Sequence, residues 1–253
     1  MKKIIELQNI KRNFQVGDET VHALRGISFT IYEGEFVTIM GTSGSGKSTL
    51  LNTLGCLDTP TSGEYLLDGV SVRTMSKPQR AVLRNRKIGF VFQNFNLLPR
   101  QSALENVELP LLYAGVGKRE RRQRAKAALE KVGLAQRMMF KPTQLSGGQK
   151  QRLSIARAIA KHPRVFIFDD SFSALDLKTD AILRKELAAN VSDATVIIVA
   201  QRISTILHAD QILVMDDGKI VGKGTHEELM KTCETYQQIA SSQLSAKELG
   251  KEA

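Results

Sequence analysis

The sequence has few cysteines, few prolines and no long hydrophobic run, and these absences narrow the class of protein. Its two cysteines, Cys56 and Cys233, lie far apart without metal-like spacing, which argues against a disulfide framework or a zinc site and suits a reducing cytoplasm. No apolar run approaches the ~20 residues that cross a bilayer. The start of the chain, MKKIIELQNIKR, lacks an apolar segment long enough for a secretion signal. We therefore expect a cytoplasmic protein.

The remaining composition is that of a soluble globular protein. Of 253 residues, 42% are hydrophobic and 25% charged, which is enough for one large core or two unequal lobes. The net charge of +10 fits nucleic acid, anionic lipid headgroups or nucleotide as a partner, and charge alone does not choose among them. The run 118–126 (KRERRQRAK) carries six basic residues. Because no aromatic residue interleaves, we interpret it as a solvated helix face in preference to a nucleic-acid patch.

The strongest motif in the chain is a strand–loop–helix pattern. The apolar run 36–40 (FVTIM) predicts a short buried strand, and residues 48–54 predict a helix. Between them, GTSGSGKS (41–48) fits the phosphate-loop pattern G-x-x-x-x-G-K-[ST] without a gap. The glycines let backbone N–H groups turn toward one anion, and the helix N-terminus adds partial positive charge. Lys47 can reach the β- and γ-phosphates, and Ser48 can ligate Mg²⁺. Because a strand precedes the loop and a helix follows it, the stretch predicts nucleotide binding rather than a Gly/Ser-rich turn with a coincidental lysine.

Strand and helix patterns alternate along the chain, which favours an α/β fold with a mainly parallel sheet. Strands are expected at residues 3–10, 21–31, 36–40, 64–68, 88–92, 164–168, 194–200 and 211–215. A helix is expected at 177–190, and the stretch 94–162 has mostly helical patterning. Ligands of such folds bind at the carboxyl ends of the strands, where Gly41 and Asp169 both stand.

Further motifs narrow the class of nucleotide-binding protein to which the phosphate loop belongs. Asp169 ends a hydrophobic strand and is placed to hold Mg²⁺, and Gln93 ends a strand beside it. Residues 145–149 (LSGGQ) stand before a helix, so that backbone N–H groups and a hydroxyl face an anion. Residues 173–176 (SALD) follow the metal carboxylate. With LSGGQKQR about 100 residues after the phosphate loop, residues 3–240 resemble the ATP-binding cassette (ABC) ATPases.

The resemblance implies a fold and a division of the chain. The fold would be a P-loop NTPase with a mainly parallel sheet core, an N-terminal antiparallel β subdomain and an inserted helical subdomain. The ABC ATPase domain would cover residues 1–240, with its core in 1–93 and 163–240 and its helical subdomain in 94–162. Residues 241–253 would form a polar tail.

The resemblance also implies a role for each site residue. The Walker A loop that binds the ATP phosphates comprises Gly41, Thr42, Ser43, Gly44, Ser45, Gly46, Lys47 and Ser48, and Thr49 is also expected to bind ATP. The Mg²⁺ ligands are Ser48, Gln93 and Asp169; the last is the Walker B carboxylate, and Gln93 also touches the attacking water. The signature, which cradles the γ-phosphate of the ATP bound by the opposite subunit, comprises Leu145, Ser146, Gly147, Gly148 and Gln149. Residues 173–176 form the loop that crosses the dimer interface.

Phe14, which precedes a turn at residues 17–18, has two interpretations. From the residues alone it is a core aromatic. From the resemblance it is the aromatic side chain that stacks on adenine. The sequence leaves both open.

Two positions depart from the family pattern. The family normally has a glutamate beside the Walker B aspartate as general base, and this chain has Asp170, which is one methylene shorter. A misplacement of ~1 Å can cost around a hundredfold in rate. The family normally has a histidine that contacts the γ-phosphate after strand 194–200, and this chain has Gln201, which cannot become cationic. With Gln93 and Lys47, these are the expected catalytic residues, and the two departures together resemble the weakly hydrolysing subunit of a heterodimeric exporter.

The two parts of the chain resemble different branches of the family. Residues 3–145 resemble the macrolide-export and lipoprotein-release ATPases, through stretches such as IGFVFQNFNLLP and ALENVELPL. Residues 146–240 resemble the nucleotide-binding domain of an exporter half-transporter, through SGGQKQRLSIARAIAKHPRVFIFDDSFSALD. We therefore predict a chimera joined at or near the signature.

These residues predict an ATP-binding and hydrolysing subunit of an ABC transporter that dimerises around MgATP and drives a separate membrane permease. Its partners would be an identical or a different ABC ATPase domain and the permease, docked near residues 93–99, with no nucleic acid. It would lie in the cytoplasm, peripheral on the inner face of the cell membrane. The alternatives are an ATP-locked interaction module with very slow hydrolysis and a non-transport ABC ATPase. The latter carries tandem cassettes or long coiled-coil insertions, and this sequence has neither.

Overall fold

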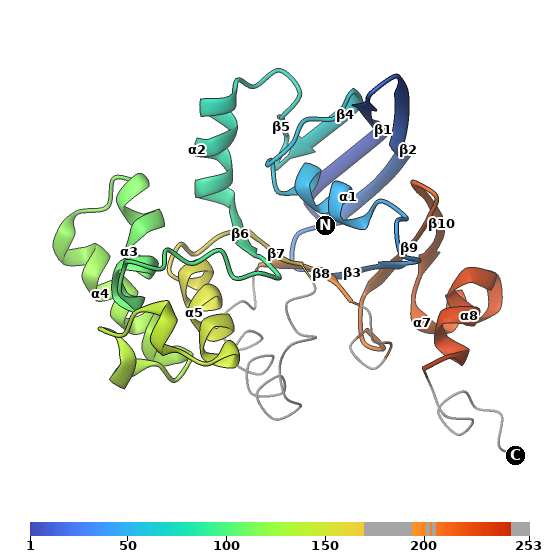
Figure 1. The fold of residues 1–253 in the computed structure, drawn as a ribbon. Helices are drawn as coiled ribbons and strands as arrows, with labels where there is room; N and C mark the ends of the chain where they lie inside the picture. Colours follow the sequence, from blue (N-terminus) through green and yellow to red (C-terminus); the bar gives the residue numbers. More distant parts are fainter. Residues whose placement is uncertain (170–193, 201–202, 204–205, 244–253) are drawn as a thin grey trace, which may run out of the picture. The chain divides into compact units, whose positions relative to one another are not determined.

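The computed structural model describes residues 1–169, 194–200, 203 and 206–243, and the chain divides into two compact units (Figure 1). The first unit comprises residues 1–80 and the described residues from Thr195 onward. The second comprises the described residues from Ala81 to 194. One boundary falls inside helix α2 (Lys77–Lys87). The predicted division into a core, a helical subdomain at 94–162 and a tail at 241–253 stays a prediction.

The first unit contains an antiparallel sheet near the N-terminus. Its strands, in the order β2-β1-β4-β5, are β2 (Glu19–Tyr32), β1 (Lys3–Val16), β4 (Ser62–Leu67) and β5 (Val70–Ser71). We predicted that the first strand ends at Ile10, but β1 pairs with β2 as far as Val16 opposite Glu19. The extension was missed because β1 is polar and largely exposed beyond Ile10, so that the hydrophobic alternation stops while the ladder continues.

The first unit also contains parallel strands around the phosphate loop. Strand β3 (Phe36–Gly41) lies between β8 (Thr195–Val199) and β9 (Gln211–Asp216) and is parallel to both, and helix α1 (Lys47–Leu54) follows it. Val37 to Met40 are buried, as expected for a strand covered on both faces. These three strands were predicted, and the mainly parallel pairing is confirmed. Strand β10 (Lys219–Gly224), antiparallel to β9, was not predicted, because its inward positions are interrupted by glycines.

The second unit combines a parallel strand pair with a group of helices. Strands β6 (Ile88–Val91) and β7 (Val165–Asp169) pair in parallel, with Val91 opposite Phe168. The helices, drawn from green to yellow in Figure 1, are α3 (Ala103–Tyr113), α4 (Lys118–Lys131), η1 (Ala135–Arg137), η2 (Pro142–Gln144) and α5 (Gly147–Ile159). Helix α3 packs against α4 and α5. The mostly helical character predicted for residues 94–162 is confirmed.

Two further helices, α7 (His226–Thr232) and α8 (Glu234–Ser241), close the described part of the chain. Thr225 caps α7 in a capping box with Glu228. Tyr236 is buried on α8; its burial raises its pKa to about 12, and its hydroxyl lies 2.8 Å from Nδ1 of His226. Among the described residues, every helix is too short or too polar to cross a bilayer.

The buried hydroxyl of Tyr65 generates a stability prediction. Tyr65, on β4, is fully buried, and its hydroxyl donates a hydrogen bond of 2.7 Å to the carbonyl of Leu54 at the end of α1. Tyr65→Phe deletes that donor, so we expect the free energy of unfolding to fall by about 1–3 kcal/mol in urea denaturation. The control Tyr113→Phe, at a residue that is 74% exposed, should stay within about 0.5 kcal/mol of the parent. Equal losses in the two variants would contradict this account of Tyr65.

Candidate functional site

The phosphate loop connects β3 to α1 in the first unit, as the sequence predicts. Three of its glycines have positive φ: Gly41 at 149°, Gly44 at 77° and Gly46 at 96°. Gly46 is the N-cap of α1, and no side chain caps that helix end. The first turn of α1 contains no acidic residue. The positive end of the helix therefore remains available to an anion.

Two of these glycines are required by close backbone approaches. A Cβ on Gly41 would lie 2.0 Å from the carbonyl oxygen of Met215, its partner on β9. A Cβ on Gly46 would lie 2.5 Å from the carbonyl oxygen of Ala23. By contrast, a Cβ on Gly44 would enter open space, although its positive φ is also unfavourable for other residues.

Lys47 folds back onto the loop that precedes it. Its Nζ donates to the carbonyl oxygens of Gly41 at 3.0 Å and Thr42 at 2.5 Å, and it lies 3.3 Å from Oγ of Ser45. The ammonium group is therefore already located at the loop that an anion would occupy. Thr42, through its hydroxyl, donates to the carboxylate of Asp216 at 2.9 Å, which ties the loop to the end of β9.

The remaining loop residues divide into an outward and an inward set. The exposed or half-buried positions are Gly41, Thr42, Ser43, Gly44, Gly46, Lys47, Ser48 and Thr49. Ser45 is buried, and its carbonyl accepts from the amide of Gly218 at 3.1 Å. Ser45 therefore anchors the loop, while the hydroxyl of Ser48 stands on the accessible first turn of α1.

Phe14 is not a core residue, because it is 37% exposed. The guanidinium carbon of Arg12 lies 4.4 Å from the centroid of its ring, a cation–π geometry. Arg12 is itself held by Asp58, through Nε at 2.7 Å and Nη2 at 3.0 Å. An exposed aromatic ring with one cation against it can accept a planar base. Our sequence reasoning missed Arg12 and Asp58, which are separated by 46 positions and form no local pattern.

In the second unit, Gln93 and Asp169 stand at the carboxyl ends of neighbouring parallel strands. Asp169 is the last residue of β7, and Gln93 comes two positions after β6 ends at Val91. Since Val91 is opposite Phe168, the two residues stand at the same edge of the strand pair. Amide and carboxylate oxygens suit Mg²⁺, which commonly combines one or two carboxylates with phosphate oxygens. The side chains of Gln93 and Asp169 therefore offer donors that fit the chemistry of this ion.

The signature residues form the capped N-terminus of α5. Ser146 is the N-cap, and its Oγ accepts from the amide of Gln149 at 3.3 Å. The Gln149 side chain accepts in return from the amide of Ser146 at 3.0 Å. Leu145 is buried, whereas Ser146 and Gly147 are exposed and a Cβ on Gly147 would meet open space. The S-x-x-Q spacing is a sequence signal for this capping box, which our sequence reasoning did not use.

Several predicted site residues lie outside the described residues. They are Asp170, Gln201, the interface loop 173–176 and the helix expected at 177–190. The other predicted residues divide between the two units. Phe14 and residues 41–49 belong to the first unit, and Gln93, Asp169 and residues 145–149 belong to the second.

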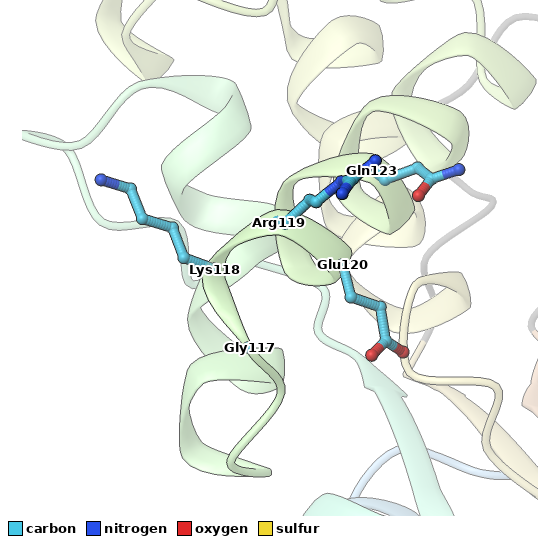
Figure 2. Close-up of a pocket in the computed structure, with 5 residues that line it drawn as sticks. All are labelled: Gly117, Lys118, Arg119, Glu120 and Gln123. Carbon is cyan, nitrogen blue, oxygen red and sulfur yellow. The ribbon is translucent and has the colours of Figure 1, made fainter.

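The basic run at 118–126 forms the exposed side of α4. This helix buries Ala125, Ala128 and Leu129 and leaves most of its charged residues exposed, as expected for a solvated helix face. A pocket of about 450 Å³ lies at its start, and Figure 2 shows Lys118 and Glu120 extending away from the helix in different directions. It is lined by Gly117, Lys118, Arg119, Glu120 and Gln123. None of the predicted site residues lines it.

Comparison with known proteins gives consistent matches. The family model described as ABC transporter matches residues 24–173. An ABC transporter ATP-binding protein of Bacillus subtilis, YknY, is 49% identical over 86% of this chain and 95% of its own length. The macrolide export ATP-binding/permease protein MacB of Syntrophobacter fumaroxidans is 49% identical over 86% of this chain but only 31% of its own length. The solved dimer of the cassette MJ0796, bound to ADP and Pi in a post-hydrolysis state, is 41% identical with a TM-score of 0.83, over 88% of this chain and 98% of its own.

The loop geometry predicts that Gly41 and Gly44 differ in their tolerance of a side chain. Gly41→Ala places its methyl group against the Met215 carbonyl, so we expect the free energy of unfolding to fall by about 3 kcal/mol or more. Gly44→Ala has the same unfavourable sign of φ without the clash, and should cost about 1 kcal/mol. Urea denaturation monitored by circular dichroism measures both. Losses of the same size would show that backbone conformation, and not the contact with β9, sets the requirement at Gly41.

Proposed function

The chain belongs to the ABC transporter family, and from this membership we propose that it is an ATP-hydrolysing subunit that dimerises around MgATP to drive a membrane permease. The observation that carries the proposal is the presence, in one chain, of two helix ends suited to phosphate. One is the start of α1 behind the glycine loop, and the other is the start of α5 at Ser146.

The first helix end would hold the triphosphate of ATP. Lys47 lies against the carbonyls of Gly41 and Thr42, so its ammonium needs only a short displacement to meet β- and γ-phosphate oxygens. The loop residues 41–49 would supply backbone N–H groups, and the exposed ring of Phe14 would stack on adenine. Arg12 supports this role of Phe14 by covering part of its ring.

Ser48, Gln93 and Asp169 would hold Mg²⁺, which when bound neutralises charge that develops on the phosphate oxygens. Asp169 supplies a carboxylate at the end of β7. Gln93 would also orient the attacking water through its amide, and Asp170 would accept the proton from that water. Gln201 would hydrogen-bond the γ-phosphate.

The second helix end would act on the ATP of another chain. Ser146 accepts a hydrogen bond from Gln149, so its own hydroxyl hydrogen remains for a phosphate oxygen. Leu145 anchors the segment while Gly147 leaves space for close approach of an anion. The solved structure of MJ0796 is described as dimeric, which supports a dimer here, formed with an identical or a different ABC ATPase domain.

A permease and a membrane location complete the proposal. MacB is named an ATP-binding/permease protein, and this chain matches about a third of it. We propose that the permease is a separate subunit, which docks near residues 93–99 and holds the protein at the inner face of the cell membrane. The chimera that the sequence predicts, with two branches of the family joined at or near the signature, stays a prediction.

The second candidate is an ATP-locked interaction module, and a specific sequence observation favours it. Asp170 is shorter than the usual glutamate, and Gln201 cannot carry the charge of the usual histidine. Such a protein would still bind MgATP and dimerise. Turnover separates it from the first candidate.

Nucleotide binding and dimerisation generate the next prediction. The parent should be monomeric without nucleotide and dimeric with MgATP, because a shared ligand links binding to association. Lys47→Ala should abolish ATP binding, and Ser146→Arg should retain binding but stay monomeric, since it places bulk and charge at the phosphate contact. Isothermal titration and light scattering measure these two properties.

A matched control for Ser146→Arg is Gln123→Arg, which adds the same charge at an exposed position on α4. It should dimerise like the parent. Ser146→Arg also removes a helix cap at a cost of about 1 kcal/mol, so its unfolding midpoint is recorded alongside. A parent chain whose mass does not change with MgATP would overturn the proposed function.

Hydrolysis generates a separate prediction. Asp170→Glu should raise steady-state phosphate release by restoring the reach of the base, and Gln201→His should add to it only in the presence of Glu at 170. The affinity for ATP should change little, because neither side chain is a main phosphate anchor. Equal rates for the parent and the double variant, at saturating MgATP with the dimer confirmed, would mean that these residues do not limit turnover.

A further inference from the structure

The segment after β6 contains an unusual turn. Phe95 and Asn96 are consecutive non-glycine residues with positive φ, at 60° and 47°. Asparagine tolerates this region, but phenylalanine rarely adopts it, so the conformation must be imposed by contacts with the rest of the unit. The turn begins two residues after Gln93.

A half-buried arginine from α5, Arg157, binds this turn. Arg157 donates from Nη1 to the carbonyl oxygen of Asn96 at 2.6 Å and from Nη2 to that of Phe95 at 2.8 Å. Its burial lowers the pKa of the guanidinium, which nevertheless remains charged at neutral pH. The two terminal nitrogens of one planar guanidinium therefore bind two successive carbonyls, which belong to residues 61 and 62 positions before Arg157 in the sequence.

The same segment is held at its far end by α3. The side chain of Asn106, which is fully buried, accepts from the amide of Leu98 at 2.8 Å and donates to its carbonyl at 3.2 Å. On the other side, β6 is fixed by its ladder with β7 as far as Val91. Gln93 itself is exposed, so its location depends on the backbone between these anchors.

We propose that Arg157 is a positioning residue for Gln93: by binding the Phe95–Asn96 turn, it fixes where the Gln93 amide stands. The inference rests on the proposed function for the role of Gln93. Arg157 and Ser146 both belong to the α5 segment, so a displacement of the signature end of this helix is transmitted to the Phe95–Asn96 turn through one rigid element. ATP engaged at the signature thereby affects the residue that orients the attacking water.

Lys161 provides a matched control for this role. It lies four positions after Arg157 and is also a half-buried cation that donates to backbone carbonyls, to Ile88 at 2.6 Å and Arg84 at 3.5 Å. Burial, together with Arg84 and Arg157, lowers its pKa to about 8. Its contacts are on α2 and at the start of β6, whereas those of Arg157 are beyond the end of that strand.

The experiment compares Arg157→Met, Arg157→Lys and Lys161→Met with the parent. Hydrogen–deuterium exchange without nucleotide reports on the backbone of residues 93–97, and steady-state kinetics report kcat and KM for ATP. We expect Arg157→Met to speed exchange of this segment about tenfold and to lower kcat by about tenfold or more with KM within about twofold, because ATP is anchored elsewhere. Arg157→Lys, which keeps one donor nitrogen, should recover part of both effects. Lys161→Met should leave both readouts near those of the parent, even where it lowers overall stability.

The proposal is overturned if exchange of residues 93–97 is unchanged in Arg157→Met, if it rises equally in Lys161→Met, or if it rises while kcat stays the same. A parent that does not hydrolyse MgATP at all contradicts the proposed function. That outcome is distinguishable from failure of the role proposed for Arg157, because the exchange measurement without nucleotide tests that role by itself.

Discussion

The close approach of two backbones at the end of β3 is the constraint on which the phosphate loop depends. Gly41 pairs with Met215 of β9 in a parallel ladder and then turns at once into the loop, where any Cβ would collide with the Met215 carbonyl. Gly46 meets a similar limit at the Ala23 carbonyl as α1 begins. Between these two points the chain has little freedom, so the start of α1 and the ammonium of Lys47 are presented together at one edge of the parallel strands.

The second element that we propose to bind phosphate, the start of α5, is built by different means in the other unit. At the start of α5 the backbone is fixed by a capping box between Ser146 and Gln149, and a buried Leu145 anchors the approach. Side-chain hydrogen bonds therefore fix the backbone at the start of α5, whereas close packing of glycines fixes it in the phosphate loop. Gln93 is placed in yet another way, by a segment that Arg157 and Asn106 hold through backbone carbonyl and amide groups.

The sequence predicted most of the fold because apolar periodicity marks strands and helices, and it predicted the motif residues because the geometry of a phosphate restricts both residue type and spacing. The strands before Gln93 and Asp169 were anticipated in the first way, and the loop at 41–48 and the segment 145–149 in the second. What it did not reveal are contacts between distant residues, such as Arg12 with Asp58 and Arg157 with Asn96, which leave no periodic pattern. Strand β10 and helices α7 and α8 were also missed; the capping box of Thr225 and Glu228 was a signal for α7. The roles of Asp170 and Gln201 remain predictions, since both lie outside the described residues.

The central claim is that each ATP is held by the phosphate loop of one chain and the signature of another. Mixing Lys47→Ala and Ser146→Arg chains tests it most directly, because a head-to-tail pair of the two retains one site with both elements intact. The account predicts that neither variant alone gains mass on addition of MgATP, while the equimolar mixture forms a dimer that holds one nucleotide. A mixture that stays monomeric at concentrations where the parent dimerises, or a Ser146→Arg chain that dimerises alone, would contradict it.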